Sequence, residues 1–427
     1  MFSSLFKSKI YFLSYVILSR LFLDLCYFFY IVPIYSYQGF VNDFSIEKHC
    51  FSLLVTIFIQ NFLKNYSFKP SNLFLLIMMA FVLLPIGTLY SFGVLDNEFF
   101  LKVNILLTLI FLLNNFNLNF TSSLKFSFIS KFLDLKTFLI LVVVLLYSKY
   151  GVNLNFNILN IIEPTDLYLQ RSEYKSINIG YFSYLLSNFH NVLLPFIFGF
   201  SIYFRKKLLF LISSFTYIYI FLITSHKMIF FAPFLIIFSF LLLFQNNNSL
   251  PFNLRFFNYF LIFVSLSFVI DYLNFFEYPI FNSIIIRRMF FLPALIGSQY
   301  LEYFSINGPT YFSDVFQSLS PFPVTGMANI IGRYFYQEGN YANTGFIYDS
   351  LTKAGLLSAI LYIFILKIIL SMMDSFSKNK NDFLVFCSIV IPFISLTNSS
   401  LSTTILTHGL LTSLVLIFLI PNERIIK

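Results

Sequence analysis

The chain has 427 residues, of which 58% are hydrophobic and only 11% are charged. An ordinary soluble domain carries about 25% charged residues, so this composition excludes a soluble globular protein and indicates an integral membrane protein. The formal net charge of +9 does not indicate nucleic-acid binding, because the lysines and arginines lie in short segments between apolar stretches.

Apolar stretches recur along the whole chain. A helix needs about 20 residues to cross the hydrocarbon core of a bilayer. The first stretch lacks the small-residue cleavage site of a signal peptide, so we expect it to be retained as a span. The sequence predicts an all-α membrane helix bundle of about twelve transmembrane helices, near 11–32, 48–64, 72–94, 97–115, 136–150, 178–203, 207–224, 228–245, 258–276, 353–374, 382–397 and 402–420.

The charges between these stretches indicate an orientation. If the N-terminus is cytoplasmic, the inner segments carry most of the basic residues, such as those at 205–207 and 378–380, and the outer segments carry most of the acidic ones. Cytoplasmic segments of membrane proteins are enriched in Lys and Arg. The sequence therefore predicts a multi-pass protein with both termini in the cytoplasm.

This orientation leaves two long segments outside, 151–177 and 277–352, in a single integral membrane domain spanning 1–427. The middle of the second segment is rich in Gly, Pro and Asn, as in NGPTYFSD and QEGNYANTG. Such residues interrupt regular structure. We expect a large outer loop that contains short helices lying on the membrane face rather than one continuous helix.

Few charged or metal-ligating side chains occur inside the predicted spans. Arg20 and Asp24 are four residues apart in the first span, so they share a helix face, and we expect a structural ion pair. Asp271, near the end of its span, is expected to reach the interface. The four histidines and three cysteines show no ligand spacing, so the sequence predicts no bound metal and no cofactor.

Five basic residues fall on the predicted outer side: Arg171, Lys227, Arg287, Arg288 and Arg333. Guanidinium groups stay charged and bind phosphate oxygens in pairs, which suits a pyrophosphate at headgroup level. Outer tyrosines, among them Tyr168, Tyr300 and Tyr303, offer rings on which sugars can stack. The alternative is that these cations pair with outer acids or with lipid phosphates.

Several short motifs resemble those of the O-antigen polymerases, the oligosaccharide repeat-unit polymerases of bacterial envelopes. The stretch 166–175 reads DLYLQRSEYK and is similar to a motif that follows a short outer loop in that family. The resemblance continues with Asn191 and Pro195 in the next span, with Ser-His-Lys at 225–227, with RRMFFLPA at 287–294 and with NTGF at 343–346.

The resemblance implies a GT-C-like membrane fold and a glycosyltransferase at the periplasmic face of the bacterial inner membrane. Such an enzyme moves a glycan from one undecaprenyl pyrophosphate carrier onto a second carrier-linked repeat unit, without a metal and without nucleic acid. Membrane lipid and a chain-length regulator protein are the other partners implied. The catalytic candidates are Asp166, Arg171, Glu173 and Arg288. The candidates for substrate binding are Tyr168, Lys227, Arg287, Tyr300, Tyr303, Arg333 and Asn343.

Two other functions fit the same layout. A flippase for lipid-linked oligosaccharides also has about twelve spans, but flippases concentrate charge in a central cavity, whereas this chain concentrates cations outside. An O-antigen ligase, which moves finished glycan to a lipid core, shares the layout of the polymerases. The sequence alone leaves the ligase open.

Overall fold

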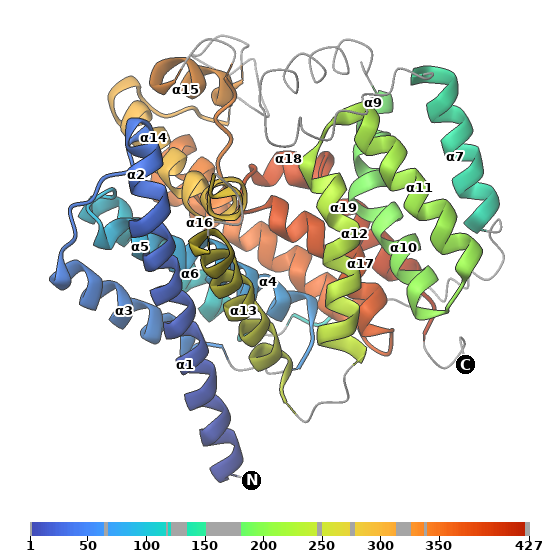
Figure 1. The fold of residues 1–427 in the computed structure, drawn as a ribbon, viewed down its shortest axis with the longest axis horizontal. Coiled ribbons are helices and arrows are strands. Elements are labelled where there is room, and N and C mark those ends of the chain that lie inside the picture. The colour runs from blue at the N-terminus through green and yellow to red at the C-terminus, as the bar shows by residue number, and fades with distance from the viewer. Residues whose placement is uncertain are drawn as a thin grey trace. The chain divides into compact units, whose positions relative to one another are not determined.

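The structure is a computed structural model, and it describes residues 2–63, 67–116, 118–120, 135–150, 181–245, 250–273, 278–312, 326–336 and 340–422. Within these ranges the regular elements are all helices, as expected for an all-α fold, and none of them is a strand. Figure 1 shows these helices, and several of them contain π-helical turns, such as η1, η3 and η8. Turns of this kind are frequent at functional sites.

Among the described residues, eight helices are long and apolar enough to cross a membrane: Lys9–Gln38, Pro70–Ser91, Tyr181–Tyr203, Lys207–Thr224, Phe252–Tyr272, Phe281–Asn307, Phe346–Ser377 and Leu401–Leu419. Seven of them coincide with predicted spans. The other five predicted spans form shorter helices, namely α3 (Ile46–Gln60), α6 (Asn97–Leu113), α7 (Leu135–Tyr150), α12 (Lys227–Ser239) and α17 (Asp382–Ser395). The total of about twelve spans therefore stays a prediction.

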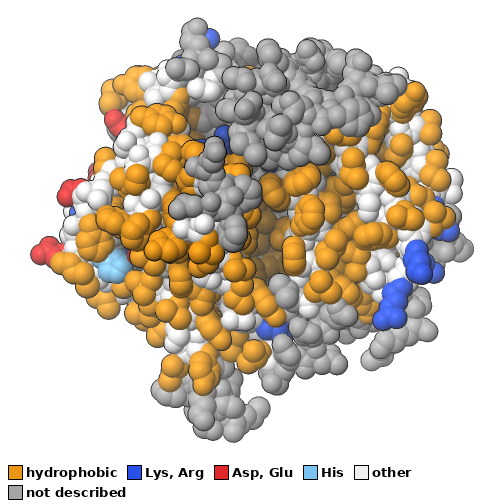
Figure 2. Space-filling view, viewed as in Figure 1, with side chains coloured by type: hydrophobic (Ala, Val, Ile, Leu, Met, Phe, Trp, Pro, Cys, Tyr) orange, Lys and Arg blue, Asp and Glu red, His pale blue; other side chains and the backbone are white. Residues whose placement is uncertain are grey.

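The surface is that of a membrane protein. Large apolar side chains such as Leu54, Leu185, Phe215 and Leu357 are each at least 65% exposed. Figure 2 shows hydrophobic side chains over most of the face that it draws, with few charged groups among them. Burying such side chains in lipid removes the cost of exposing them to water.

The helices form two compact units. Unit 1 comprises Met1–Leu118, Ser249–Ser371 and Ile394–Ser402. At its centre, α4 (Pro70–Met78), η3 (Met79–Leu83) and α5 (Leu84–Ser91) form one continuous helix that is buried along nearly its whole length. In the same unit α1 (Phe2–Cys26) packs along α13 (Phe252–Tyr272), and α3 packs against α5. Phe12 of α1 meets Phe257 of α13 edge to face, with ring centroids 5.2 Å apart.

Unit 2 comprises Asn119–Asn248, Met372–Phe393 and Thr403–Lys427. Its core contains α10 (Leu194–Tyr203), α11 (Lys207–Thr224) and α12, which pack on one another. Gly199 of α10 lies so close to the Cys387 side chain of α17 that a β-carbon would collide with the sulfur. The sequence predicts three buried thiols; Cys26 and Cys387 are buried, whereas Cys50 is exposed.

The segment 277–352 differs from the sequence prediction. In place of short helices, η8 (Phe281–Phe291) and α14 (Leu292–Asn307) form one helix of 27 residues, followed by the short α15 (Met327–Phe335). Pro293 lies where the π-helical η8 passes into α14, and the helix continues through it. Gly297 is there because the Tyr348 ring packs onto it, 2.5 Å from where a β-carbon would lie.

Asp271 is buried and caps this long helix. Its carboxylate accepts hydrogen bonds from the backbone amides of Phe281 and Asn282, at 3.3 and 2.7 Å, and from the Asn282 side chain at 2.8 Å. An acidic group at a helix N-terminus satisfies free amides and complements the helix dipole. Asp271 thereby fixes where the helix begins and which way Arg287 and Arg288 face.

Candidate functional site

The side chain of Arg287 is buried at the end of unit 1 where η8 meets the tip of the first helix. Its Nη1 donates to Oε1 of Gln38 at 2.7 Å, and its Nε donates to the Ser283 carbonyl oxygen at 3.3 Å. The guanidinium stacks on the Tyr35 ring, with Cζ 3.9 Å from the centroid. All the contacts that the structure gives this cation are with neutral groups, so its charge is held in place without being neutralised by them.

Arg288, the next residue, is exposed. Consecutive helical residues face different directions, so one arginine points into unit 1 and the other points out. Within the part of the chain that the structure describes, Arg288 makes no hydrogen bond or ion pair. The two residues form a paired cationic site with one fixed and one accessible guanidinium.

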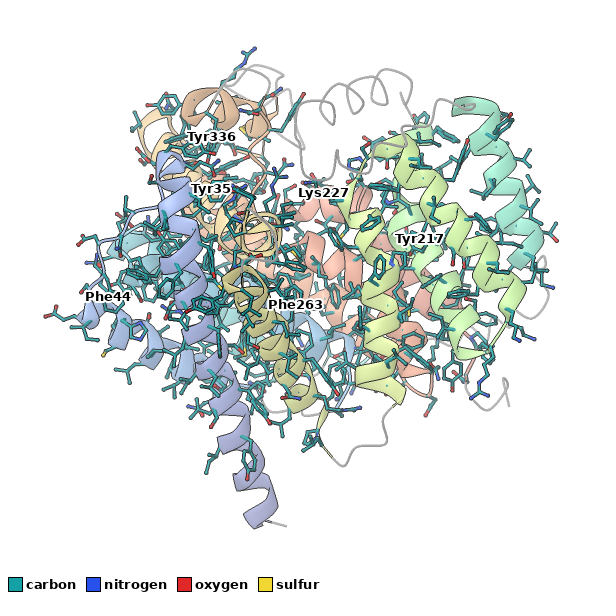
Figure 3. All side chains as sticks on the ribbon, viewed as in Figure 1. Tyr35, Phe44, Tyr217, Lys227, Phe263 and Tyr336 are labelled. Carbon is teal, nitrogen blue, oxygen red and sulfur yellow. The ribbon has the colours of Figure 1, made fainter. Side chains whose placement is uncertain are left out.

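Tyrosine hydroxyls surround the buried arginine. The Tyr35 hydroxyl bonds that of Tyr278, and the Tyr336 hydroxyl donates to Oε1 of Gln299 on α14 at 3.0 Å. Burial raises the pKa of Tyr336, while the Gln299 bond and the nearby charge of Arg287 act in the opposite direction. Tyr336 is therefore a neutral hydroxyl held by Gln299. Figure 3 shows Tyr35 and Tyr336 at the same end of unit 1.

The predicted tyrosines have different positions. Tyr300 is 3% exposed and donates to the Ala342 carbonyl oxygen at 2.9 Å, in a core formed with Ile296, Phe304 and Ile331. Its ring is part of the packing between α14 and α15 and is not available as a platform for a sugar. Tyr303 is half-buried, and its ring meets that of the exposed Tyr334 edge to face, with centroids 5.0 Å apart.

Arg333 and Asn343 both have exposed side chains in this part of unit 1. Arg333 lies in the last turn of α15. Asn343 lies between α15 and α16 (Phe346–Ser377), in a segment that is tightly held on both sides of it. The Thr344 hydroxyl donates to the Pro293 carbonyl oxygen at 3.0 Å, and a β-carbon on Gly345 would lie 2.5 Å from the Thr397 carbonyl oxygen. Close packing therefore accounts for Thr344 and Gly345 in the NTGF motif, and the Asn343 side chain is left exposed on the surface of the protein.

Five further site residues were predicted from the sequence: Asp166, Tyr168, Arg171, Glu173 and Lys227. Asp166, Tyr168, Arg171 and Glu173 lie outside the described residues, so their roles stay predictions. Lys227 belongs to unit 2, where it begins α12 directly after the hairpin residues Ser225 and His226. Ser225 has a left-handed backbone, with φ of 51°, which closes this hairpin tightly.

Four members of the site were not singled out by the sequence: Tyr35, Gln38, Tyr278 and Gln299. Tyr35 and Gln38 are about 250 positions away from Arg287 in the chain, and nothing in their local sequence signals the contact. The only feature of the sequence that could have indicated Tyr278 is that aromatic residues precede the Arg-Arg pair. Single aromatic residues carry little information in a chain with 63 Phe and 28 Tyr.

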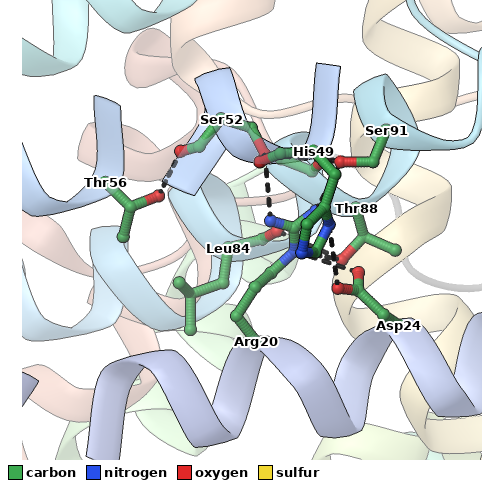
Figure 4. Close-up of polar contacts among 9 residues, drawn as sticks. Arg20, Asp24, His49, Ser52, Thr56, Leu84, Thr88 and Ser91 are labelled. Carbon is green, nitrogen blue, oxygen red and sulfur yellow. Dashed lines mark hydrogen bonds and ion pairs between the residues drawn. The ribbon is translucent and has the colours of Figure 1, made fainter. Parts of the chain in front are cut away.

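A second polar cluster lies deeper in unit 1 and is structural (Figure 4). Arg20, which is fully buried, pairs with Asp24 at 3.0 Å, as the sequence predicted. Nε also donates to the Thr88 hydroxyl, and Nη1 and Nη2 donate to the hydroxyls of Ser52 and Ser91, at 2.8 to 3.2 Å. These bonds connect α1 to α3 and α5. Because the guanidinium is fully buried and all three of its nitrogens bond to groups of these helices, the cluster holds the helices together.

The described residues contain no group of three or more His, Cys, Asp or Glu side chains that could hold a metal ion. The paired site at Arg287 and Arg288 can bind an anion by charge and by bidentate hydrogen bonds. Comparisons with protein-family models, with curated proteins and with solved structures give no match.

Proposed function

We propose that this protein is a membrane glycosyltransferase that polymerises oligosaccharide repeat units carried on undecaprenyl pyrophosphate. The observation that carries the proposal is the Arg287–Arg288 pair: a buried guanidinium that Tyr35 and Gln38 position without neutralising it, beside an exposed one. Such a pair suits a phosphate or pyrophosphate group at the surface of a membrane protein. The motif resemblance to O-antigen polymerases supports the same assignment.

The reaction follows from the chemistry of the carrier. A hydroxyl of the acceptor sugar attacks the anomeric carbon of the donor glycan, and the bond from that carbon to the pyrophosphate oxygen breaks. The leaving pyrophosphate gains negative charge as the bond breaks, so cations already placed beside it lower the barrier. The acceptor proton passes to a base, for which Asp166 and Glu173 are the candidates.

In this proposal the two arginines have different tasks. Arg287 is fixed by the Tyr35 ring and Gln38, so it provides a preorganised charge that needs no rearrangement when the leaving group departs. Arg288 is exposed and can meet the arriving pyrophosphate. Arg171 and Lys227 are the further candidates for binding the phosphates of donor or acceptor. The active face is the periplasmic one, where the carrier is the available source of activated sugar.

The test is deletion of the gene followed by gel analysis of the surface polysaccharide. A polymerase leaves single repeat units attached to the cell surface when it is lost. Loss of a flippase leaves no repeat units at all, and loss of a ligase leaves polymer on the carrier rather than on the lipid core, so either of these patterns would overturn the proposal. Purified protein should extend lipid-linked repeats in excess EDTA at close to its untreated rate, since the arginines supply the positive charge.

A further inference from the structure

The polar and aromatic side chains of α14 continue beyond the arginines as a line toward α15. Gln299 and Tyr303 are one turn apart on the same face of α14. Tyr336 bonds Gln299 at 3.0 Å, and Tyr334 packs on Tyr303 with ring centroids 5.0 Å apart. This line, Gln299, Tyr303, Tyr334 and Tyr336, is called the tyrosine track below.

The tyrosine track lies on the same continuous helix as the cationic site, since η8 carries Arg287 and Arg288 and α14 carries Gln299 and Tyr303. From Arg288 to Tyr303 the helix advances by 15 residues, so the track ends roughly 20 Å from the exposed arginine. The two ends have different chemistry. One carries positive charge, and the other carries aromatic rings, an amide and hydroxyls.

The far end of the track is open. Tyr334 is 61% exposed, and Tyr303 is half-buried beneath it. The neighbouring surface is polar as well as aromatic, since Glu302 and Asn307 are exposed on the same stretch of α14. Sugars have apolar faces that stack on tyrosine rings and hydroxyls that bond amides and carboxylates.

We infer that the tyrosine track binds the saccharide portion of the substrate, with the sugars stacked on Tyr334 and Tyr303 and with Gln299 and Tyr336 between them and the phosphates. The inference rests on the proposed function for the identity of the substrate. It adds a binding site for the glycan, separate from the site for the phosphates. A saccharide alone, without carrier or phosphate, should bind to it.

Packing contacts hold the short helix α15 against α14 and shape the track. Met327, Ile331 and Phe335 pack on the apolar face of α14, and the backbone of 340–342 lies against Gly332 so closely that no β-carbon fits there. The Ala342 amide donates to the Ala328 carbonyl oxygen at 2.9 Å. These contacts direct Tyr334 outward over Tyr303. The rings are therefore presented by a packed scaffold.

The chain contains no tryptophan, which allows a direct test. In full-length protein, Tyr334→Trp keeps an aromatic ring and places a single fluorescent reporter on the track. The probe is the repeat oligosaccharide released from its carrier and freed of phosphate. We expect a saturable change in fluorescence with Tyr334→Trp. The matched control is Tyr11→Trp on α1, also exposed, which should not respond.

Adding Tyr303→Ala to Tyr334→Trp should weaken binding of the oligosaccharide about tenfold, equivalent to about 1.4 kcal/mol. Adding Arg288→Ala instead should leave this affinity unchanged while preventing extension of lipid-linked repeats. If Tyr334→Trp extends lipid-linked repeats but its fluorescence does not respond to the oligosaccharide, the tyrosine track is not a saccharide site and the proposed function stands. If the oligosaccharide binds but unaltered protein extends no lipid-linked repeats, the proposed function fails and the saccharide site stands.

Discussion

The guanidinium of Arg287 lies 3.9 Å from the centre of the Tyr35 ring, so a charge on one helix is positioned by an aromatic side chain from another. A cation over an aromatic face is attracted by about 0.5 to 2 kcal/mol, more when both groups are removed from water. The contact fixes the direction of the guanidinium. Arg288 has no such support.

This difference predicts different outcomes for the two arginines. Arg288→Ala should lower polymerisation at least 100-fold while the protein accumulates normally in the membrane, because the side chain is exposed and its loss leaves no cavity. Arg287→Ala should lower both activity and stability, since it removes a buried group that Gln38 and Tyr35 contact. Polysaccharide gels and protein levels measured together check this. Normal polymer in Arg288→Ala cells would remove that residue from the site.

Lysine substitutions test the same difference between Arg287 and Arg288. Arg288→Lys should recover activity only in part, because a point charge cannot reproduce the bidentate guanidinium. Arg287→Lys should recover less, since lysine loses the planar stacking on Tyr35 as well. The same comparison at Arg171 tests whether that predicted residue acts with the pair.

The predicted orientation of the chain in the membrane can be tested by labelling introduced cysteines. A cysteine at Ser318 should react with a membrane-impermeant reagent added from outside, and a cysteine at Asn379 should not. The control is a variant without Cys26, Cys50 and Cys387, so that only the introduced thiol reports.

If the helix Phe281–Asn307 crosses the membrane, residues 278 and 318 lie on opposite sides, and a cysteine at Tyr278 then reacts differently from one at Ser318. Labelling at Asn379 from outside would overturn the orientation.

Gly87 provides a test of the buried cluster around Arg20. A β-carbon at this position would lie 2.8 Å from Nη1 of Arg20, so Gly87→Ala should displace the guanidinium and break bonds that connect α1 to α3 and α5. We expect a loss of stability of about 1 to 3 kcal/mol, the usual effect of overpacking a filled site. Gly326→Ala is the matched control, because a β-carbon there meets nothing within 4 Å. Thermal unfolding in detergent compares the two; equal midpoints would mean that the cluster tolerates the extra carbon.

Lys380 gives a prediction for pH dependence. Its ammonium donates to the Ile417 and Phe418 carbonyl oxygens at the end of α19 (Leu410–Leu419), and burial lowers its pKa to about 8. The unfolded chain has the ordinary lysine pKa, so between pH 8 and about 10 the unfolded state binds more protons than the folded state. Stability from this group therefore rises with pH in that window.

The measurement is the unfolding temperature of unaltered protein relative to Lys380→Met between pH 7 and 9.5. The unfolding temperature of the unaltered protein should rise relative to that of Lys380→Met as the pH increases through 8. Lys378→Met, on the exposed neighbour, controls for general effects of pH. A difference that stays constant across this range would contradict the assignment.

The apolar pattern of the sequence was enough to predict helices, and seven of the long ones lie where it indicated. It could not predict the π-turns or the break in α16 at Ala354 and Gly355, because these depend on backbone hydrogen bonding that composition does not encode. The helix at Phe281–Asn307 was missed because the Gly-, Pro- and Asn-rich middle of 277–352 was taken to interrupt the whole segment. In the fold the first of these residues end the helix, at Gly308, and leave the stretch before them continuous.

Only the charged residues of the site could be predicted from the sequence. The adjacent arginines stood out in a chain with few charged residues, but which of them is buried depends on Tyr35 and Gln38, far away in sequence. Tyr300 and Tyr303 have similar sequence surroundings. Burial of one and partial exposure of the other follow from which face of α14 receives α15, and that is a tertiary contact.

The capping of the long helix by Asp271 has a consequence for how the protein enters the bilayer during synthesis. Until Phe281 and Asn282 arrive, α13 ends in a carboxylate with none of the three donors that bind it in the folded protein. Neither helix end is satisfied alone, and an unpaired charge in lipid is costly. The two helices should therefore leave the insertion machinery as a joined hairpin, and a ribosome stalled just after Tyr272 should hold α13 at the edge of the translocon rather than release it into lipid.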